Sequence, residues 1–181
     1  GFYVPGDDAS LASLRRNGAA LDWVVPALVT VAGPNHQVTV TPDAHFQRTV
    51  AALPHPPKVL PMVQNFGDSE WDGKGAAALL ADPGQRAAFA KRLGAMVSAG
   101  HVAGLTMDIE ALPASAMRPY IAFLHELRAA MPKGSILAVT APAEDENWPL
   151  AALGAAADKV IFMAYDQHWE GGSPGPIAGQ Y

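Results

Sequence analysis

The sequence predicts an α/β protein built around a sheet of parallel strands. Six short apolar segments alternate with longer segments that carry helical patterns of leucine, alanine and arginine, and glycine and proline mark most boundaries. Strands that alternate with helices form parallel βαβ units, because each right-handed crossover returns the chain to the same end of the sheet. Six such units fit either an open doubly wound sheet or most of an eight-unit barrel.

The six strands are predicted from apolar runs that are nearly continuous. Such runs are typical of strands that are buried on both faces of a parallel sheet. They cover residues 2–4, 21–31, 58–66, 101–110, 135–142 and 159–166.

Two helices have clear boundaries in the sequence. Asp82 is a suitable N-cap, Pro83 suits the first helical position, and apolar residues recur on one face until Gly100. Apolar residues at helical spacing over 120–131 predict a second helix, which ends before Pro132. Weaker helical patterns cover residues 10–20, 43–53 and 148–157.

Composition indicates one globular domain over residues 1–181 and excludes several partners. The chain is 50% hydrophobic and 16% charged, with a net charge of -5 and only 12 lysines and arginines. This balance argues against nucleic acid or an anionic membrane surface as a partner, and favours a neutral or polar substrate. No apolar run approaches the roughly 18 residues that a membrane span requires.

The sequence contains none of the common motifs that hold a metal or cofactor. The chain has no cysteine, and its six histidines fall in no His-x-His or His-Glu-x-x-His arrangement. It also lacks Gly-x-Gly-x-x-Gly, the phosphate-binding Gly-Lys-Ser/Thr loop and the Gly-x-Ser-x-Gly elbow of serine hydrolases. We therefore expect neither a metal nor a cofactor.

Polar side chains gather where the predicted strands end, at the carboxyl edge of the sheet. This is the edge at which α/β proteins place their sites. The polar residues are Asp7, Asp8, Gln64, Asn65, Asp108, Glu110, Tyr165, Asp166 and His168.

Asp108 and Glu110 stand two apart at the end of an apolar run. On a strand their side chains project to one face, and two carboxyls in a partly dry pocket do not both ionise easily. Other acids with this spacing, in residues 68–72 and 144–146, lie in polar stretches and are interpreted as solvated loop acids. Acids that cap a strand end by binding backbone amides or a lysine are the alternative.

The stretches "GLTMDIE" and "FMAYDQHW" together resemble glycoside hydrolase family 18, the chitinase-like enzymes. The family signature is Asp-Gly-x-Asp-x-Asp-x-Glu on the fourth strand and Met-x-Tyr-Asp on the sixth. The match places its last two acids on Asp108 and Glu110, and its second motif on Met163, Tyr165 and Asp166. The resemblance implies a (β/α)8 TIM-barrel fold, of which about six of the eight β/α units are present.

The chain departs from the family pattern in three ways. Ala103 stands at the first Asp of the signature, and Thr106 stands at the middle Asp. Thr106 could hydrogen-bond Asp108 but cannot take up a proton. The last two units are absent, so the first and sixth strands would expose unpaired edges. We expect either that the native chain continues past Tyr181 or that a partner covers these edges.

The resemblance implies a glycosidase that acts on β-1,4-linked N-acetylglucosamine polysaccharide, namely chitin, peptidoglycan or exopolysaccharide. In the family the substrate's own 2-acetamido group is the nucleophile of a retaining reaction. Glu110 would be the general acid and base, and Asp108 would orient the acetamido group. Tyr165 would bind its carbonyl, and Asp166 would bind a sugar hydroxyl or the acetamido group.

Several further residues are candidates for substrate binding. Tyr3 and Trp169, near strand ends that carry motifs, are expected to stack on sugar faces. Trp71 and Trp148 are interpreted as packing residues. Gln64 and Asn65 could hydrogen-bond the sugar, although a turn at the strand end explains them almost as well.

Two other functions stay open at this point. Ala103 and Thr106 make the signature degenerate, which suits a non-catalytic glycan-binding domain, whereas Glu110 favours an enzyme. A domain that only scaffolds attached enzymes is the third possibility. Other stretches resemble the hydrolase-like domain of bacterial proteins that also carry a polysaccharide deacetylase and a family 2 glycosyltransferase, which implies attached domains and an extracytoplasmic, secreted or membrane-tethered location.

Overall fold

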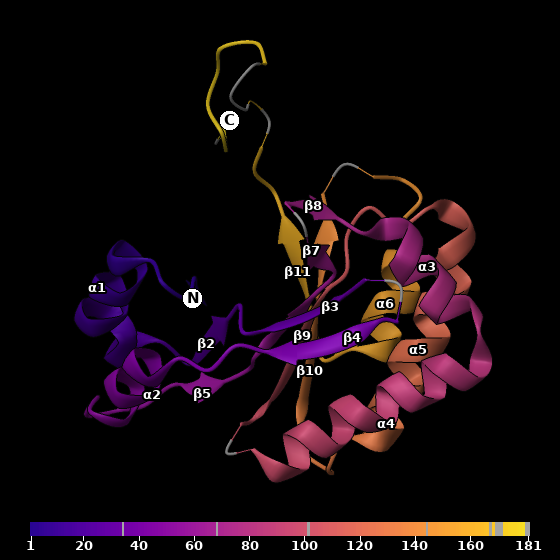
Figure 1. Cartoon of the computed structure of the whole chain (residues 1–181). Coiled ribbons are helices and arrows are strands. Elements are labelled where there is room, and N and C mark those ends of the chain that lie inside the picture. The colour runs from indigo at the N-terminus through magenta and orange to yellow at the C-terminus, as the bar shows by residue number, and fades with distance from the viewer. Residues whose placement is uncertain are drawn as a thin grey trace.

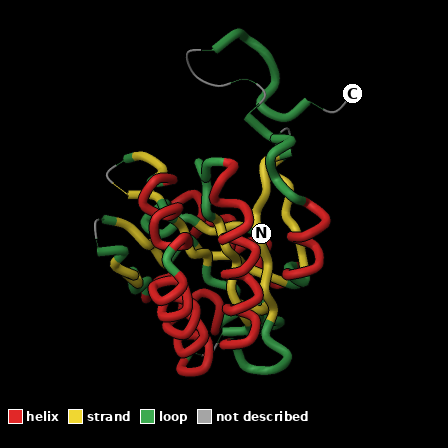
Figure 2. The backbone as a smooth tube through the Cα atoms, turned by 90° about the vertical axis from the view of Figure 1, so that its right-hand side faces the viewer, coloured by secondary structure: helices red, strands yellow, loops and turns green. Residues whose placement is uncertain are grey.

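Parallel strands alternate with helices along the chain (Figure 1). The computed structural model describes residues 1–33, 35–67, 69–100, 102–143, 145–166, 168 and 172–179. Helices α3 to α6 lie together on one side of the sheet, and α1 and α2 lie beside its first strands. The described residues after the last strand lead away from this body, as both views show (Figure 2).

All six predicted strands are present and parallel to one another. They are β1 (Phe2–Tyr3), β2 (Trp23–Pro26) continued by β3 (Val29–Ala32), β5 (Lys58–Val59) continued by β6 (Met62–Gln64), β9 (Gly104–Asp108), β10 (Ile136–Pro142) and β11 (Lys159–Met163).

Each of these strands pairs with the one that follows it along the chain, in the orders β1-β2-β5 and β3-β6-β9-β10-β11. A doubly wound sheet needs a reversal of strand order, and these described strands show none. The sequential order is that of a (β/α)8 barrel, and five of the six strands are followed by a helix before the next begins.

The predicted helices are confirmed with small shifts of their ends. They are α1 (Asp8–Asn17), α2 (Ala44–Ala51), α4 (Pro83–Ala99), α5 (Met117–Ala130) and α6 (Leu150–Ala156), with short 3-10 turns at Gly18–Ala20 and Ala114–Ala116. Asp82 caps α4 as expected, because its Oδ1 accepts from the backbone N–H groups of Gly84 at 2.8 Å and Gln85 at 2.9 Å.

The sequence did not predict four short elements. An antiparallel strand, β4 (Gln37–Val40), pairs with β3, and β7 (Phe66–Gly67) with β8 (Glu70–Trp71) forms a hairpin. Helix α3 (Gly73–Ala81) follows this hairpin. Strands of two residues carry no measurable alternation, and two glycines in the first turn of α3 lower its helical propensity.

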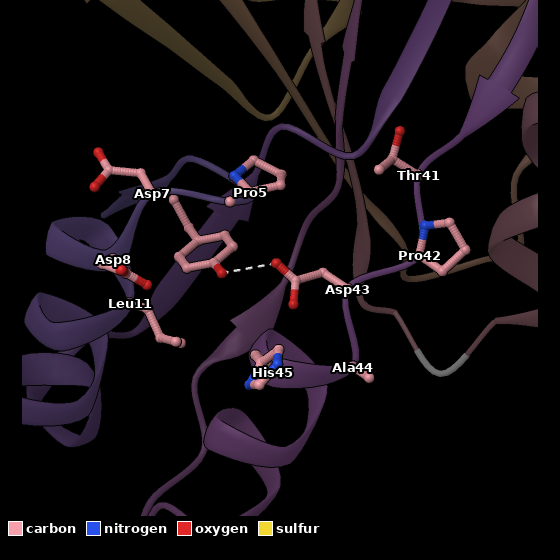
Figure 3. A pocket seen from close by; sticks show the side chains of 11 residues that line it. Pro5, Asp7, Asp8, Leu11, Thr41, Pro42, Asp43, Ala44 and His45 are labelled. Carbon is pink, nitrogen blue, oxygen red and sulfur yellow. Dashed lines mark hydrogen bonds between the residues drawn. The ribbon is translucent and has the colours of Figure 1, made fainter.

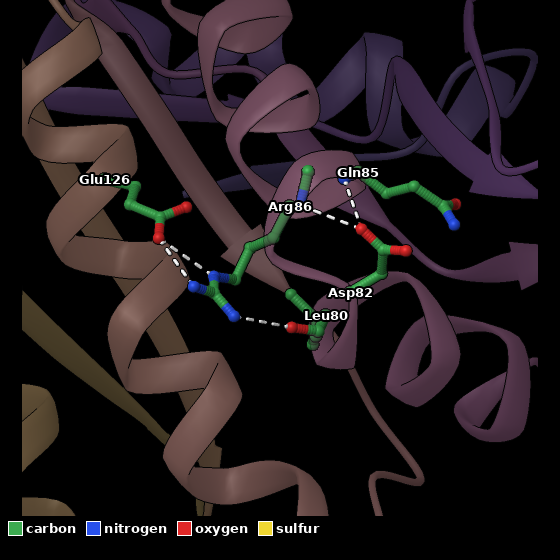
Figure 4. Close-up of polar contacts among 6 residues, drawn as sticks. Leu80, Asp82, Gln85, Arg86 and Glu126 are labelled. Carbon is green, nitrogen blue, oxygen red and sulfur yellow. Dashed lines mark hydrogen bonds and ion pairs between the residues drawn. The ribbon is translucent and has the colours of Figure 1, made fainter.

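The main core lies between the sheet and helices α3 to α6. Leu93, Phe123 and Leu137 are completely buried there, and the rings of Phe89 and Phe123 stack with centroids 5.0 Å apart. The Arg86 guanidinium joins three helices: it donates to Glu126 Oε1 on α5 at 2.8 and 3.0 Å and to the Leu80 carbonyl of α3 at 3.0 Å (Figure 4). Charge-assisted bonds of this kind hold these three helices in fixed positions relative to one another.

The opposite face of the sheet carries a smaller apolar cluster of Val25, Leu60, Met62 and Ala138. Met62 and Ala138 flank Thr106 across β6, β9 and β10. Side chains on a strand alternate between faces, so the next residues on this face are Gln64, Asp108 and Thr140. A polar layer therefore follows the apolar one towards the carboxyl ends of the strands.

No helix among the described residues has both the length and the apolar character needed to cross a membrane.

Candidate active site

Strand β9 brings Asp108 to the carboxyl edge of the sheet. All five of its residues are buried, because helices cover one face and the inner cluster covers the other. Gly104 begins the strand, and a Cβ at this position would lie 1.8 Å from the carbonyl oxygen of Ile136 on β10. Glycine thus lets β9 and β10 approach closely just below the acids.

Asp108 is held by its two neighbouring strands. Its Oδ1 accepts a 2.6 Å hydrogen bond from Thr140 Oγ1 of β10, and its Oδ2 accepts a 2.8 Å bond from Gln64 Nε2 of β6. The side chain is only 5% exposed. Both oxygens are therefore fixed from opposite sides within one layer of the sheet.

Glu110 lies beyond the end of β9, not within the strand as the sequence predicted. At this position the side chain of Asn65 hydrogen-bonds the backbone of Glu110, as a paired strand would. Its Oδ1 accepts from Glu110 N at 2.8 Å, and its Nδ2 donates to the Glu110 carbonyl at 2.9 Å. Asn65 is 1% exposed, so its amide fixes the backbone that carries the Glu110 side chain.

The Glu110 carboxyl group is partly buried and receives no hydrogen bond from any described residue. Burial, followed by the negative charges of Asp108 and Asp166, raises the pKa of Glu110 to about 7. A carboxyl with this pKa is largely protonated just below neutral pH, which is the state that a general acid needs.

Tyr165 and Asp166 follow β11 and lie near Asp108 and Glu110. Burial, followed by the charges of Asp108, Glu110 and Asp166, raises the pKa of Tyr165, so its phenol stays a hydrogen-bond donor at neutral pH. Tyr165 is nevertheless 50% exposed, and Asp166 adopts a left-handed φ of 62°. The structure thus brings four of the predicted residues within electrostatic reach of one another.

A cavity of about 200 Å³ opens beside Glu110. Its wall is mostly apolar and includes Trp148, which is 6% exposed and meets Tyr120 edge to face with ring centroids 6.0 Å apart. Trp148 is the packing residue that the sequence predicted, yet it also lines this cavity. The lining residues are Glu110, Ala111, Leu112, Pro142, Asp145, Trp148 and Met163.

Tyr3 lies at a different place from the acids. Its ring is 2% exposed and packs on Phe46, and its hydroxyl donates to Asp43 Oδ2 at 2.7 Å (Figure 3). It lines a cavity of about 440 Å³ that shares no residue with the cavity at Glu110. Phe2 pairs with Val25 on β2, and Val25 belongs to the inner apolar cluster, so position 2 of β1 faces the inside of the sheet. Neighbouring residues of a strand face opposite sides, so Tyr3 points outward, towards α1 and α2.

Thr106 does not hydrogen-bond Asp108, contrary to what the sequence allowed. Its Oγ1 is buried and has no hydrogen-bond partner among the described residues. Thr140, which was not predicted from the sequence, donates to Asp108 instead. The signal was a threonine near the end of a predicted strand, but its partner could not be read without the register of β10 on β9.

Trp169 lies outside the described residues. Within the described ranges, no group of three or more histidine, aspartate or glutamate side chains is arranged to hold a metal ion.

Comparison with known proteins places this geometry in a family. The sequence profile described as "Glycosyl hydrolases family 18" matches residues 21–180. The chain is 26% identical over 188 residues to the uncharacterized glycosylase YvbX of Bacillus subtilis (strain 168). The aligned region covers 97% of this chain and 54% of that protein. It therefore covers about half of this curated relative.

Solved structures share the fold. A chitinase from Chromobacterium violaceum is 26% identical and superposes with a TM-score of 0.81 over 98% of this chain and 59% of that one. The second catalytic domain of a group II chitinase from Ostrinia furnacalis, in complex with penta-N-acetylchitooctaose, gives 18% identity and a TM-score of 0.75 over 92% and 50%. The expected (β/α)8 barrel type is confirmed.

Proposed function

Since this chain belongs to glycosyl hydrolases family 18, we propose that it hydrolyses β-1,4-linked N-acetylglucosamine polymers with Glu110 as the general acid. The observation that carries the proposal is the pairing of a half-buried Glu110, with a pKa of about 7, and an Asp108 carboxylate held by both oxygens. The similarity to a chitinase and to a chitinase that holds a chito-oligosaccharide supports this substrate class.

The reaction assigns a separate role to each side chain. Glu110 donates its proton to the glycosidic oxygen while the carbonyl oxygen of the substrate's 2-acetamido group attacks C1. The bond to the leaving sugar breaks and an oxazolinium forms. Glu110 then removes a proton from water, which attacks C1 and opens the oxazolinium. Two displacements at C1 retain its configuration.

Asp108 and Tyr165 act on the acetamido group. Asp108 accepts a hydrogen bond from the acetamido N–H and stabilises the positive charge of the oxazolinium, and this attraction is strong because Asp108 is buried. Tyr165 donates to the acetamido carbonyl, and Asp166 binds a sugar hydroxyl or the same group. The substrate contacts of Gln64, Asn65 and Trp169, the attached domains and the extracytoplasmic location stay predictions from the sequence.

A glycan-binding domain without activity is the weaker alternative. Ala103 and Thr106 suit it, but a binding domain has no need for a carboxyl whose pKa is raised towards neutrality by burial beside a second acid. Intact oligosaccharide that binds to the protein but is never cleaved is the result that this alternative requires.

Glu110→Gln tests the proposal. The amide keeps the size of the side chain but supplies no proton, so we expect turnover of N-acetylglucosamine oligomers to fall by about 10³-fold while binding is retained. Mass spectrometry of the products measures cleavage, and NMR of the first products shows whether the anomeric configuration is retained.

Glu70→Gln is the matched control for this experiment. Glu70 is an exposed carboxylate on β8, so the same chemical change there should leave turnover within about twofold. Turnover by Glu110→Gln that equals that of the unmodified chain would remove Glu110 from the mechanism.

A further inference from the structure

Asp108 occupies a site built from two strands that flank its own. Thr140 Oγ1 and Gln64 Nε2 reach different oxygens of the carboxylate, at 2.6 and 2.8 Å, from β10 and β6. Thr140 is 3% exposed and Asp108 is 5% exposed, so water does not compete for these bonds. A carboxylate bound through both oxygens has little freedom to rotate about its side-chain torsions.

Thr106, the residue before Asp108 on the same face of β9, does not help to hold the Asp108 carboxylate. Thr106 lies two residues before Asp108 on the same face of β9, and its buried hydroxyl finds no partner among the described residues. Its position is the one at which the resemblance implies a second acid. Among the described residues, the side chains that donate to the Asp108 carboxylate are therefore the neutral groups of Thr140 and Gln64.

We propose that Thr140, assisted by Gln64, is a positioning residue that holds Asp108 in one orientation and takes the place of the acidic neighbour missing at position 106. The inference rests on the proposed function for the catalytic role of Asp108, but the two hydrogen bonds that orient Asp108 are present in the folded chain without substrate. Each carboxylate oxygen can accept two hydrogen bonds, so Asp108 keeps acceptor capacity for the substrate's acetamido N–H while both donors stay in place.

The consequence is that the described side chains bound to Asp108 carry no carboxyl group of their own. Thr140 and Gln64 cannot accept a proton from Asp108, so the acid pair does not exchange one through a third carboxyl. The titratable groups that Asp108 influences are Glu110 at the end of β9, Tyr165 after β11 and Tyr120 of α5, and Asp166 acts on Glu110 and Tyr165. Both tyrosines stay protonated at neutral pH, because burial raises their pKa.

The test compares Thr140→Val, which keeps the shape but loses the hydroxyl, with Thr140→Ser, which keeps the hydroxyl. Carbon-13 NMR of labelled glutamate, assigned with Glu110→Gln, follows the titration of Glu110 directly. We expect one single-proton step in the unmodified chain and in Thr140→Ser. In Thr140→Val the released Asp108 competes for the proton, so the curve should become biphasic or move by about one pH unit.

The kinetic arm uses the same variants with N-acetylglucosamine oligomers. Loss of a hydrogen bond to a charged group should lower the kcat of Thr140→Val about 10- to 100-fold with KM within about twofold, whereas Thr140→Ser should stay within about threefold of the unmodified chain. Thr106→Val is the matched control for the titration. It removes the buried Thr106 hydroxyl, which hydrogen-bonds no described residue, so the Glu110 curve should stay unchanged.

The outcomes separate this inference from the proposed function. A Thr140→Val curve that superimposes on that of the unmodified chain overturns the inference, even where the chain hydrolyses the oligomers. Equal damage from Thr140→Ser and Thr140→Val also overturns it, because the hydroxyl would then not be the cause. A chain that cleaves nothing but shows the expected titration change refutes only the proposed function.

Discussion

Two strand ends in this molecule combine a tyrosine with carboxylates, but they hold their acids differently. At the end of β1, Tyr3 meets Asp43, and Asp7 lies nearby (Figure 3). At the end of β9, Asp108 and Glu110 lie within electrostatic reach of Tyr165. Residue types alone do not distinguish these two regions.

The acids of the first region bind backbone N–H groups. Asp43 accepts from Phe46 N at 2.8 Å and caps α2, and Asp7 accepts from Ala9 N at 2.7 Å and caps α1. The bond from Phe46 N, together with that from the Tyr3 hydroxyl, outweighs burial and holds the pKa of Asp43 below its ordinary value. Asp43 therefore stays ionised at neutral pH, and both acids stabilise the helices that they cap.

In the second region, Glu110 binds no described donor through its carboxyl group, and burial beside two further acids raises its pKa to about 7. Acids are present at both strand ends, so their presence does not separate a capping residue from a proton donor. The difference is that backbone N–H groups donate to Asp7 and Asp43, whereas no described group donates to the Glu110 carboxyl group. It also shows why the alternative of acids that bind backbone amides applies to Asp7 and Asp43 but not to Glu110.

The pH dependence of turnover should provide the largest contrast between the regions. The acid must be protonated, so kcat/KM should fall about tenfold for each unit of pH above about 7. Asp43→Asn should leave this falling limb in place, because Asp43 is remote from the proton that Glu110 transfers. A limb whose midpoint lies below about pH 5 would show that Glu110 is ionised under working conditions and is not the acid.

The pH dependence of the free energy of unfolding reports the raised pKa of Glu110 without any substrate. The folded-state pKa of Glu110 lies above its ordinary value of 4.5, so the folded chain binds this proton more tightly than the unfolded chain. The stabilisation is complete below about pH 4.5 and is lost as the pH rises through about 7. Urea unfolding of Glu110→Gln should lack this dependence.

Asp43→Ala should damage stability and not chemistry. It removes the cap of α2 and leaves the buried Tyr3 hydroxyl without its acceptor, so we expect a loss of about 1–2 kcal/mol in the free energy of unfolding. Urea unfolding measures this loss, and the NMR titration of Glu110 should not move. Asp8→Ala is the control, because Asp8 is an exposed neighbour with no capping bond of its own and should cost at most about 0.5 kcal/mol.

The sequence predicted whatever depends on residues near one another in the chain. The apolar run into Asp108, the cap at Asp82 and the order of strands and helices are local patterns, and the structure confirms them. The two motifs on β9 and β11 could be joined because parallel strands place their carboxyl ends at one edge.

The contacts that arrange the site join residues far apart in the chain. Thr140 lies 32 positions from Asp108, and Asn65 lies 45 positions from Glu110. Such contacts depend on strand register and on where a strand stops, which composition and periodicity do not define. For the same reason the outward direction of Tyr3 was missed: a shift of one residue on a two-residue strand exchanges the two faces.

Tyr3→Phe should have the smallest effect and tests that direction. Burial, with help from Asp43, raises the pKa of Tyr3 to about 12, so its hydroxyl is a donor to Asp43 throughout the neutral range. Phenylalanine keeps the ring on Phe46 and loses only this bond, while Asp43 still caps α2. We therefore expect a loss of about 1 kcal/mol in urea unfolding, smaller than for Asp43→Ala, and none of it once Asp43 is already alanine. A raised KM for N-acetylglucosamine oligomers at unchanged stability would instead make Tyr3 the sugar contact that the sequence predicted.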